Sequence, residues 1–398
     1  MMDACLRFRN IIVIVSLALL SGCKSVDTPP NLTEHEQNLK QTQSIMCHDE
    51  TDVQKLQPLE TQILNPIAFY PMGITSSQDS TVYTEQIKSR ILSHNGSENS
   101  ELWSLTGCGP SSIESDNETF LITCYQSSSL IRISKSSPVK ILDTYFGYRN
   151  AYGLSSDGKG GFYFTSAGTL QKNSPKEGEI YFLDSDKRIR KVADGIHYAA
   201  GLAVIEKGKF LLVAEQLQNR VLKYKIQENG DLMPIYDQTT IADPQKMESK
   251  KTKGKNKKAK PVKTKTAKKS GLKKSKRPLA VTSVFLDLDD LKSPYPDPTG
   301  GLRGPDQIWM NTDNMIFVSQ YASSRILKYR MERKKSKFVG SVVIDSEFQN
   351  LTHFLVQGTK IYLSASQINP ANQNQGIVFT VNDPILNSRR KLICSPNK

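Results

Sequence analysis

Apolar residues in this chain recur in pairs of short runs, and one pair is especially clear. Residues 201–224 hold two runs rich in β-branched and large apolar side chains, separated by a polar break at 215–219. This pattern predicts a strand, a tight connection and a second strand. It returns in residues 308–329, where a shift of 105 positions aligns Val213 with Val318. Two hairpins this similar indicate a repeated structural unit.

Four weaker copies of the pattern occur elsewhere in the chain. In each copy an apolar pair precedes a polar turn, a strand ending in Thr, Ser or Ala, a polar gap, and a strand carrying Ile or Val. The copies span residues 74–92, 111–133, 153–183 and 351–379. The anchor residues at 91, 131, 180, 221, 326 and 377 are 40, 49, 41, 105 and 51 positions apart.

This spacing predicts an all-β fold. Six units, most of them 40 to 50 residues apart, are typical of a six-bladed β-propeller, here over residues 62–394. A blade cannot cover both faces of its own sheet, so neighbouring blades must stack and the first must join the last. A β-sandwich with fortuitous spacing is the alternative.

The first 22 residues have the pattern of a secretory signal peptide. Arg7 and Arg9 precede an apolar run from Ile11 to Leu20, which is too short to cross a membrane. The Leu-Ser-Gly-Cys sequence that follows resembles the bacterial lipoprotein box, in which the Cys thiol is acylated and the chain is cut before it. We therefore expect the mature protein to begin at a lipidated Cys23; a soluble secreted protein is the alternative.

Lipidation at Cys23 would anchor the protein to a membrane of a bacterial cell envelope, on the periplasmic or surface side. Residues 23–61 are polar, contain Pro29 and Pro30, and show little periodicity. These properties predict a tether that lets the propeller stand off the membrane. Which membrane carries the anchor is left open.

Four cysteines lie outside the signal peptide and the lipidated position. Cys108 and Cys124 fall in one predicted blade, whereas Cys47 and Cys394 flank the two ends of the repeat array. Because export permits disulfides, we expect Cys47 to pair with Cys394 and Cys108 with Cys124. The first bond would staple the ring where a propeller must close. Four buried thiols are the alternative.

Between the fourth and fifth predicted blades, residues 245–278 are dominated by lysine. Lys246 to Arg277 holds fifteen Lys and one Arg against one Glu, so it contributes +15 to a chain whose formal net charge is +14. The rest of the chain is therefore close to neutral. With almost no apolar residues to bury, this insertion is predicted to be disordered.

A lysine run of this kind is suited to a polyanionic partner. No aromatic residue interleaves the lysines to stack on bases, and the predicted export places them outside the cytoplasm, so nucleic acid is disfavoured. Anionic lipids, lipopolysaccharide or cell-wall polymers are the preferred partners of Lys246 to Arg277. A loop that is only solvated is the alternative.

Three stretches carry a family resemblance. Residues 150–166, 199–224 and 305–329 resemble the blades of the senescence-marker-protein-30, gluconolactonase and luciferin-regenerating-enzyme family, and the resemblance covers about residues 68–380. It implies a divalent cation, usually Ca²⁺, in the central channel. There the ion polarises a lactone carbonyl and a carboxylate helps to activate water. Strictosidine-synthase-like and NHL-type propellers are the alternatives.

The resemblance also identifies candidate site residues. The Asp of the family falls on Asp306, which is therefore the candidate catalytic and metal-binding residue. Asn150 is a second candidate ligand if the preceding loop shifts by one residue. The family's Glu and Asn fall instead on Met72 and Ala200. Losing two oxygen ligands predicts a degenerate metal site, with no certain cofactor and with Ca²⁺ as the one candidate.

Two functions follow from these residues. The favoured one is an envelope lipoprotein whose propeller mouth binds a small molecule, an envelope polymer or a protein. The alternative is a divalent-metal-dependent hydrolase of lactones or related esters with a remodelled site. In that case oxygens of Glu85, Glu215 or Gln320 would have to complete the cation's shell. Three histidines fall in different predicted blades and two in the predicted tether, and no pattern brings them together.

Overall fold

The computed structural model describes the propeller and leaves both ends of the chain and its insertion aside. It describes residues 45–49, 52–77, 80–136, 138–235, 284–288, 301–311, 314–323, 325–332, 335–344, 350–367, 375–382 and 392–396. The predicted signal peptide 1–22, the lipidation site Cys23, part of the tether and the lysine-rich insertion 245–278 therefore lie outside the described residues. Within the described ranges, no helix is both long and apolar enough to span a membrane.

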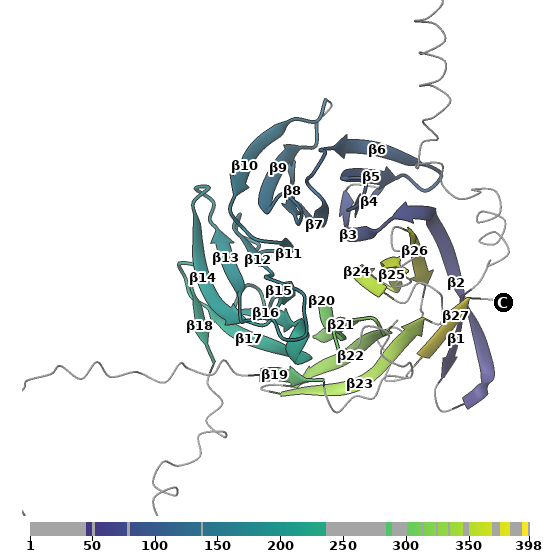
Figure 1. Ribbon diagram of the computed structural model, residues 1–398. Coiled ribbons are helices and arrows are strands. Elements are labelled where there is room, and N and C mark those ends of the chain that lie inside the picture. Colours follow the sequence, from purple (N-terminus) through teal and green to yellow (C-terminus); the bar gives the residue numbers. More distant parts are fainter. Residues whose placement is uncertain are drawn as a thin grey trace, which may run out of the picture. The chain divides into compact units, whose positions relative to one another are not determined.

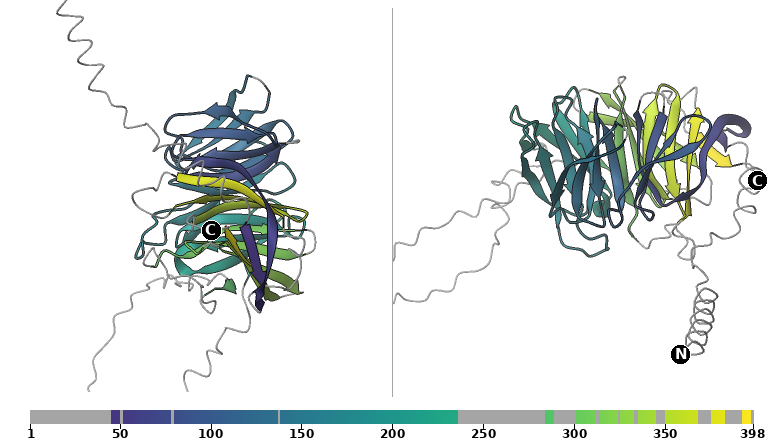
Figure 2. Two further views of the ribbon diagram at one scale, coloured as in Figure 1. Left: turned by 90° about the vertical axis from the view of Figure 1, so that its right-hand side faces the viewer. Right: turned by 90° about the horizontal axis from the view of Figure 1, so that it is seen from above.

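The described strands form a six-bladed β-propeller, which confirms the predicted fold (Figure 1). Within each blade the strands are antiparallel, and each blade begins with the strand nearest the central channel. Figure 2 shows the blades packed side by side when the ring is seen edge on.

Four strands follow one another in chain order in each of the first three blades. Blade 1 comprises β3 (Pro71–Ser77), β4 (Ser80–Glu85), β5 (Arg90–His94) and β6 (Asn99–Ser104). Blade 2 comprises β7 (Pro110–Ser115), β8 (Thr119–Cys124), β9 (Ser129–Ser134) and β10 (Ile141–Phe146). Blade 3 comprises β11 (Ala151–Ser156), β12 (Phe162–Ser166), β13 (Gly178–Leu183) and β14 (Ile189–Ile196).

Blades 4 and 6 depart from this plan at their outer edges, whereas blade 5 keeps it. Blade 4 comprises β15 (Ala199–Ile205), β16 (Phe210–Glu215), a short 3-10 helix η1 (Gln216–Gln218), β17 (Arg220–Ile226), β18 (Leu232–Pro234) and β19 (Val284–Asp287). Blade 5 comprises β20 (Gly304–Met310), β21 (Met315–Tyr321), β22 (Arg325–Glu332) and β23 (Lys335–Ile344). Blade 6 comprises β24 (Asn350–Gln357), β25 (Lys360–Ser366), β26 (Gln375–Asn382) and β2 (Asp52–Phe69).

The second strands of the blades explain why apolar runs, and not alternation, mark the repeats. Every residue of β8 and of β12 is buried. A strand that is covered on both faces reads as a nearly continuous apolar run. Between blades 2 and 3, for example, Leu121 and Leu130 pack with Leu154 and Phe164 in one cluster.

The ring is closed by the N-terminal strand β2. It pairs antiparallel with β26, with Ile63 opposite Phe379, and so supplies the outer strand of the last blade. Closure of this kind leaves no unpaired edge between the first and last blades. Strand β2 begins at Asp52, and β1 (Ile45–Asp49) precedes it, so both strands overlap the range 23–61 that was expected to form a tether.

A strap of two further strands joins the outer edges of blades 5 and 6. Strand β1 pairs with β2 on one side and with β27 (Leu392–Pro396) on the other, and β27 pairs parallel with β23. Cys47 and Cys394 face each other in the register of β1 and β27. The disulfide expected between them stays a prediction, now with a backbone register that brings the two residues together.

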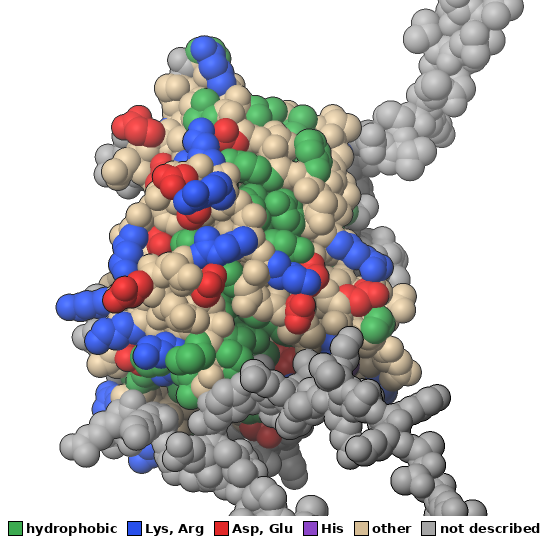
Figure 3. All heavy atoms as spheres, turned by 90° about the vertical axis from the view of Figure 1, so that its left-hand side faces the viewer, with side chains coloured by type: hydrophobic (Ala, Val, Ile, Leu, Met, Phe, Trp, Pro, Cys, Tyr) green, Lys and Arg blue, Asp and Glu red, His purple; other side chains and the backbone are tan. Residues whose placement is uncertain are grey.

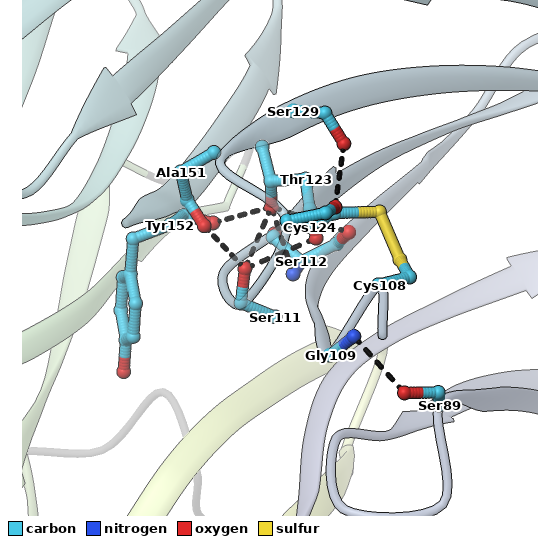
Figure 4. The surroundings of a disulfide bond; sticks show 11 residues. Ser89, Cys108, Gly109, Ser111, Ser112, Thr123, Cys124, Ser129, Ala151 and Tyr152 are labelled. Carbon is cyan, nitrogen blue, oxygen red and sulfur yellow. Dashed lines mark hydrogen bonds between the residues drawn. A yellow bond between two sulfur atoms is a disulfide. The ribbon is translucent and has the colours of Figure 1, made fainter. Parts of the chain in front are cut away.

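Blade 2 holds a disulfide between the two cysteines that were expected to pair there. Cys108, just before β7, and Cys124, the last residue of β8, are bonded with an S–S distance of 2.02 Å (Figure 4). The bond ties the entrance of the inner strand to the end of the second strand. It lies beside the contact between blades 2 and 3, where Figure 4 shows Ser111 and Thr123 bonded to Ala151 and Tyr152.

The long interval in the repeats falls at the outer edge of blade 4. Strand β18 pairs with Tyr224–Ile226 of β17, and β19 pairs with Arg220–Leu222 of the same strand. Together β18 and β19 thus form one outer strand in two pieces. The lysine-rich insertion lies in the sequence between these two pieces, so it is inserted at the rim of the propeller and not at the channel. Insertions are tolerated best in such surface connections.

The described surface carries charges of both signs. On the face shown in Figure 3, Lys and Arg side chains lie among Asp and Glu side chains without forming a single-sign patch. Several are paired, as Arg188 is with Asp184 at 3.0 Å and Lys191 with Glu179 at 3.1 Å. This mixture agrees with a nearly neutral propeller whose basic excess belongs to the insertion.

Candidate functional site in the central channel

The inner strands surround the central channel, and each begins with an irregularity in its pairing. In β11, Ala151 pairs with Ser166 and Leu154 with Phe164, so one extra residue is accommodated between them. The other inner strands show the same shift. A bulge re-aims side chains and is common next to functional sites. In each inner strand, the first residue after the last regular pair before the bulge marks an equivalent position. In blades 1 to 6 this position is occupied by Met72, Ser111, Tyr152, Ala200, Asp306 and Thr352.

Hydroxyl groups near these positions hold neighbouring blades together. Ser111 Oγ donates to the carbonyl oxygen of Ala151 at 2.7 Å, and Thr352 Oγ1 donates to that of Pro71 at 2.7 Å. Second-strand hydroxyls do the same: Thr123 bonds to Tyr152 O, Thr165 to Ala200 O and Ser364 to Met72 O. These bonds satisfy buried carbonyls that the bulges leave outside the ladders. The hydroxyls are therefore committed to blade packing.

Glycine permits the inner strands to approach one another closely. A Cβ on Gly201 would lie 2.3 Å from the carbonyl oxygen of Asp306, and one on Gly153 would lie 2.5 Å from that of Ala200. Neither position has room for a side chain. The glycines next to the channel thus set its width.

Asp306 is completely buried at the channel. Its Oδ1 accepts a hydrogen bond of 2.7 Å from the Tyr152 hydroxyl, and its Oδ2 has no partner among the described residues. Burial raises the pKa of the carboxyl from 3.8 to about 8, and the Tyr152 bond only partly offsets this. At neutral pH Asp306 is therefore mostly a neutral acid.

The oxygens of Glu85, Glu215 and Gln320 are engaged in hairpin contacts. Glu85 Oε2 lies 2.7 Å from Arg90 Nε, and Glu215 Oε2 lies 2.6 Å from Arg220 Nε. Gln320 accepts the equivalent bond from Arg325. The same contact thus recurs in blades 1, 4 and 5, at the end of the second strand. These groups stabilise the hairpins and do not complete a cation shell around Asp306.

Asn150 lies just outside the ring of channel positions. It adopts a left-handed conformation with φ of 52°, and its side-chain amide donates to the carbonyl oxygen of Gly168 at 2.6 Å. The channel position of blade 3 belongs instead to Tyr152, two residues on. The structure therefore does not bring Asn150 and Asp306 into contact.

The residues around Asp306 do not fit a Ca²⁺ ion. Calcium takes six to eight oxygen ligands, and carboxylates dominate its sites. Among the described residues, no group of three or more His, Cys, Asp or Glu side chains is placed to hold a metal. Met72 and Ala200 are both buried in the apolar cluster that also contains Tyr152. A single carboxyl among apolar and aromatic side chains is a poor site for a hard cation.

Four tyrosines lie near Asp306 and a fifth, Tyr125, packs against one of them, and the sequence repeats did not predict this group. We call this group the Tyr collar: Tyr70, Tyr125, Tyr152, Tyr198 and Tyr321. Tyr70 and Tyr198 immediately precede the inner strands β3 and β15, Tyr152 lies in β11, Tyr125 follows β8 and Tyr321 ends β21. Each of the first five blades therefore contributes one ring.

Ring contacts connect the Tyr collar. The Tyr152 ring centroid lies 6.2 Å from that of Tyr125 and 5.9 Å from that of Tyr198, in edge-on geometry. Burial, and after it the nearby hydroxyls, raise the pKa of Tyr321, which lies beside Tyr70, and the pKa of Tyr198, which lies beside Tyr125. Burial, together with Asp306 and the other collar hydroxyls, raises the pKa of Tyr152 and Tyr198. The hydroxyls of Tyr152 and Tyr198 are thus neutral donors and acceptors at physiological pH.

The sixth blade contributes His353. Its ring centroid is 5.9 Å from that of Tyr152, and neither ring nitrogen has a hydrogen-bond partner in the described part of the chain. Burial lowers the pKa of His353 from 6.5 to about 4, so its imidazole is neutral. The channel thus combines a neutral acid, a neutral imidazole and five phenol rings.

A hollow lies away from the channel, on blades 3 and 4. It is lined by turn and strand residues that include Asp157, Phe182 and Gly230. Its polar groups have partners: Arg190 pairs with Asp231 at 2.9 Å, and the Tyr163 hydroxyl donates to Gly230 O. This hollow brings together neither the predicted site residues nor the unpartnered buried groups of the channel.

Comparison with known protein families agrees with the propeller fold and identifies a similar family. Residues 75–251 match the SMP-30/Gluconolactonase/LRE-like region. Residues 75–251 are therefore similar to this family, as the blade sequences indicated. No curated protein matches the sequence.

Solved structures share this fold at low sequence identity. A luciferin-regenerating enzyme is similar with a TM-score of 0.56 and 11% identity, over 82% of this chain and 96% of that one. A calcium-binding protein, regucalcin, from Agrobacterium tumefaciens has a TM-score of 0.54 and 10% identity, over 82% and 95%. A gluconolactonase from Xanthomonas campestris has a TM-score of 0.53 and 11% identity, over 86% and 95%. Identities this low establish the fold alone.

Proposed function

We propose that this protein is a ligand-binding propeller, anchored in a bacterial envelope through Cys23, that does not carry out metal-dependent hydrolysis. The observation that carries the proposal is the state of Asp306. Its carboxyl is fully buried, its Oδ1 accepts a bond from Tyr152, and within the described residues it belongs to no group of three or more His, Cys, Asp or Glu side chains that could hold a metal. A metal-bound carboxylate would have to be ionised and joined by further oxygens.

The channel has the composition of a binding site. Ligand sites are mostly apolar and aromatic, with a few placed polar groups that fix orientation. Here Tyr152, Tyr198, Met72 and Ala200 share one cluster, while Asp306 Oδ2 and the His353 nitrogens are polar atoms without partners among the described residues. A small organic molecule is the class of ligand that such a lining suits best.

Calorimetry with Ca²⁺ tests the proposal most directly. The soluble form that starts after Cys23, and its Asp306→Ala variant, are titrated with Ca²⁺ and then assayed against a panel of lactones. We expect no Ca²⁺ binding at millimolar concentration and no turnover. Binding that disappears in Asp306→Ala would overturn the proposal.

A metal-dependent lactone hydrolase is the second candidate. It is favoured by one feature, because Asp306 occupies the position at which the resembling family keeps its Asp. In that case turnover should require a divalent cation and should be abolished by a chelator. The same titration and lactone panel therefore separate the two functions.

The anchor and the lysine-rich insertion form the envelope part of the proposal. Cys23→Ala should abolish incorporation of labelled palmitate and release the protein from membranes. Deleting residues 246–277 should reduce retention on lipopolysaccharide or anionic vesicles if that segment binds envelope polyanions. Unchanged retention would show that the segment is only solvated.

A further inference from the structure

We propose that the Tyr collar and Asp306 form a binding site for an organic cation that carries a quaternary or methylated ammonium group. The inference rests on the proposed function, because it assigns a chemical class to the ligand of the same channel. It starts from the convergence of five tyrosine rings, one from each of the first five blades, on a single buried carboxyl.

Aromatic rings and one carboxyl are the groups that recognise methylated ammonium ions. The faces of phenol rings are electron-rich and attract cations, and ammonium groups with methyl substituents are bound in cages of such rings. In the Tyr collar the ring centroids of neighbours lie 5.9 to 6.2 Å apart around Tyr152. Met72 and Ala200 add apolar surface for methyl groups.

No cationic side chain is among the main electrostatic influences on four of the collar tyrosines. The electrostatic influences on Tyr70, Tyr152, Tyr198 and Tyr321 come from Asp306 and from other collar tyrosines. The arginines of the nearby hairpins are bound to Glu85, Glu215 and Gln320. A bound ammonium ion would therefore be the charge that favours the ionised form of Asp306.

Backbone conformation shows that two collar rings are held in place at a cost. Tyr70 and Tyr198 have φ of 52° and 55°, a left-handed conformation that bulky residues rarely adopt. Gly109 and Asn150 occupy the same position before their inner strands, with φ of 56° and 52°, and these residue types tolerate it. Strained residues cluster at ligand sites. The backbone conformation does not favour tyrosine at positions 70 and 198, so the aromatic ring is the better reason for its presence there.

The unpartnered oxygen of Asp306 completes the site. Asp306 Oδ1 is bonded to Tyr152, which leaves Oδ2 free within the described residues to face a ligand. Whereas Ca²⁺ needs many oxygens at once, a bulky ammonium ion spreads its charge over its methyl groups and needs one carboxylate and several ring faces. The lining that fails for a metal therefore suits an organic cation.

A pair of ligands with the same shape tests the role of charge. The full-length protein in maltoside micelles is titrated calorimetrically with choline, with tetramethylammonium, and with 3,3-dimethylbutan-1-ol, which matches choline in shape but has no charge. We expect choline to bind at least about ten-fold more tightly than the alcohol. Equal affinities, or no binding of either cation at about 10 mM, would overturn the inference.

Variants of the collar test the role of the rings. Tyr125 is only half-buried, so Tyr125→Leu should weaken choline binding about three- to thirty-fold, and Tyr125→Phe, which keeps a ring, should lose clearly less. Asp306→Asn should weaken it about ten-fold or more. Tyr181→Phe removes a hydroxyl bonded to Glu179 outside the collar and should leave binding unchanged. Equal losses for Tyr125→Leu and Tyr181→Phe would refute the cage.

The outcomes separate this inference from the proposed function. If neither cation binds and Ca²⁺ and the lactones also fail, the propeller remains a non-metal binding protein and only the ligand class is wrong. If Ca²⁺ binds through Asp306, both the proposed function and this inference are wrong. The comparison of choline with its neutral analogue needs no variant, so it holds even if a collar substitution fails to fold.

Discussion

The buried acid at Asp306 should make the stability of the protein fall as the pH rises. The folded-state pKa is about 8, against an ordinary value of 3.8 in the unfolded chain. Between these two values the folded protein binds one proton more than the unfolded chain. Its contribution to stability is therefore fully present below the lower value and is lost as the pH rises through the higher one.

Asp306→Asn isolates this effect, because asparagine has almost the same shape and can still accept the bond from Tyr152. One bound proton corresponds to about 1.4 kcal/mol per pH unit. From about pH 5 to about pH 7, the free energy of unfolding of the variant should therefore gain about 2.7 kcal/mol relative to the unaltered protein. Other titrating groups, such as His353, are common to both proteins and cancel in the difference.

Urea denaturation at a series of pH values, followed by tryptophan fluorescence, measures the two free energies. Asp184→Asn provides the control, because the backbone N–H of Arg188 lowers the pKa of that carboxyl and its loss should give no gain over the same range. Parallel profiles for Asp306→Asn and the unaltered protein would refute the reasoning. They would mean that Asp306 is ionised in the fold, with water or a cation beside it.

Three further predictions concern the contacts that build the blades. Arg220→Met removes the guanidinium that pairs with the buried Glu215 carboxylate and should lower the free energy of unfolding by about 3 kcal/mol. As the matched control, Arg188→Met changes a side chain that is 74% exposed, and the free energy of unfolding should change by less than about 0.5 kcal/mol. Thr165→Val removes the hydroxyl that accepts from Gly153 N and donates to Ala200 O; urea denaturation should show a loss of about 3 kcal/mol that Thr165→Ser largely restores. The double variant Cys108→Ala, Cys124→Ala opens a bond across 16 positions and should lose about 3 kcal/mol in the same measurement, and an unchanged midpoint would show that the bond does not form.

The blades were predictable because their signal is local. Strands such as β8 and β12 are buried on both faces, so each copy reads as an apolar run between polar turns. Residues of one hairpin are also close in sequence, which keeps the spacing regular. The match of Val213 with Val318 was enough to reveal this unit, since both lie in the second strand of a blade.

The closure of the ring was not predictable by the same means. Strand β2 pairs with β26, which lies at the other end of the described chain, and β27 pairs with both β1 and β23. The partner of an edge strand leaves no periodic mark in the sequence, because any strand of suitable length satisfies its backbone. Part of a range expected to be a tether therefore forms strands.

The candidate site was predictable only in part. Asp306, Met72 and Ala200 all lie at equivalent positions of bulged inner strands, as the resemblance placed them. The Tyr collar was missed because the repeats were aligned on apolar residues. A signal was nevertheless present, since Tyr70 precedes β3 as Tyr198 precedes β15, and Tyr125 follows Cys124 as Tyr321 follows Gln320.

The Tyr collar also gives a physical reason why a channel that has lost metal ligands should contain aromatic rings in their place. A Ca²⁺ site needs ionised oxygens and water around the ion, whereas ring faces and apolar side chains raise the cost of ionising a carboxyl. Tyr152 brings a ring to the channel position of blade 3, and its hydroxyl already occupies Asp306 Oδ1. Once a phenol stands there, restoring Glu at Met72 and Asn at Ala200 should not restore calcium binding, whereas doing so together with Tyr152→Asn should. Calorimetry on the double and triple variants distinguishes a site that has merely lost ligands from one rebuilt for a different kind of guest.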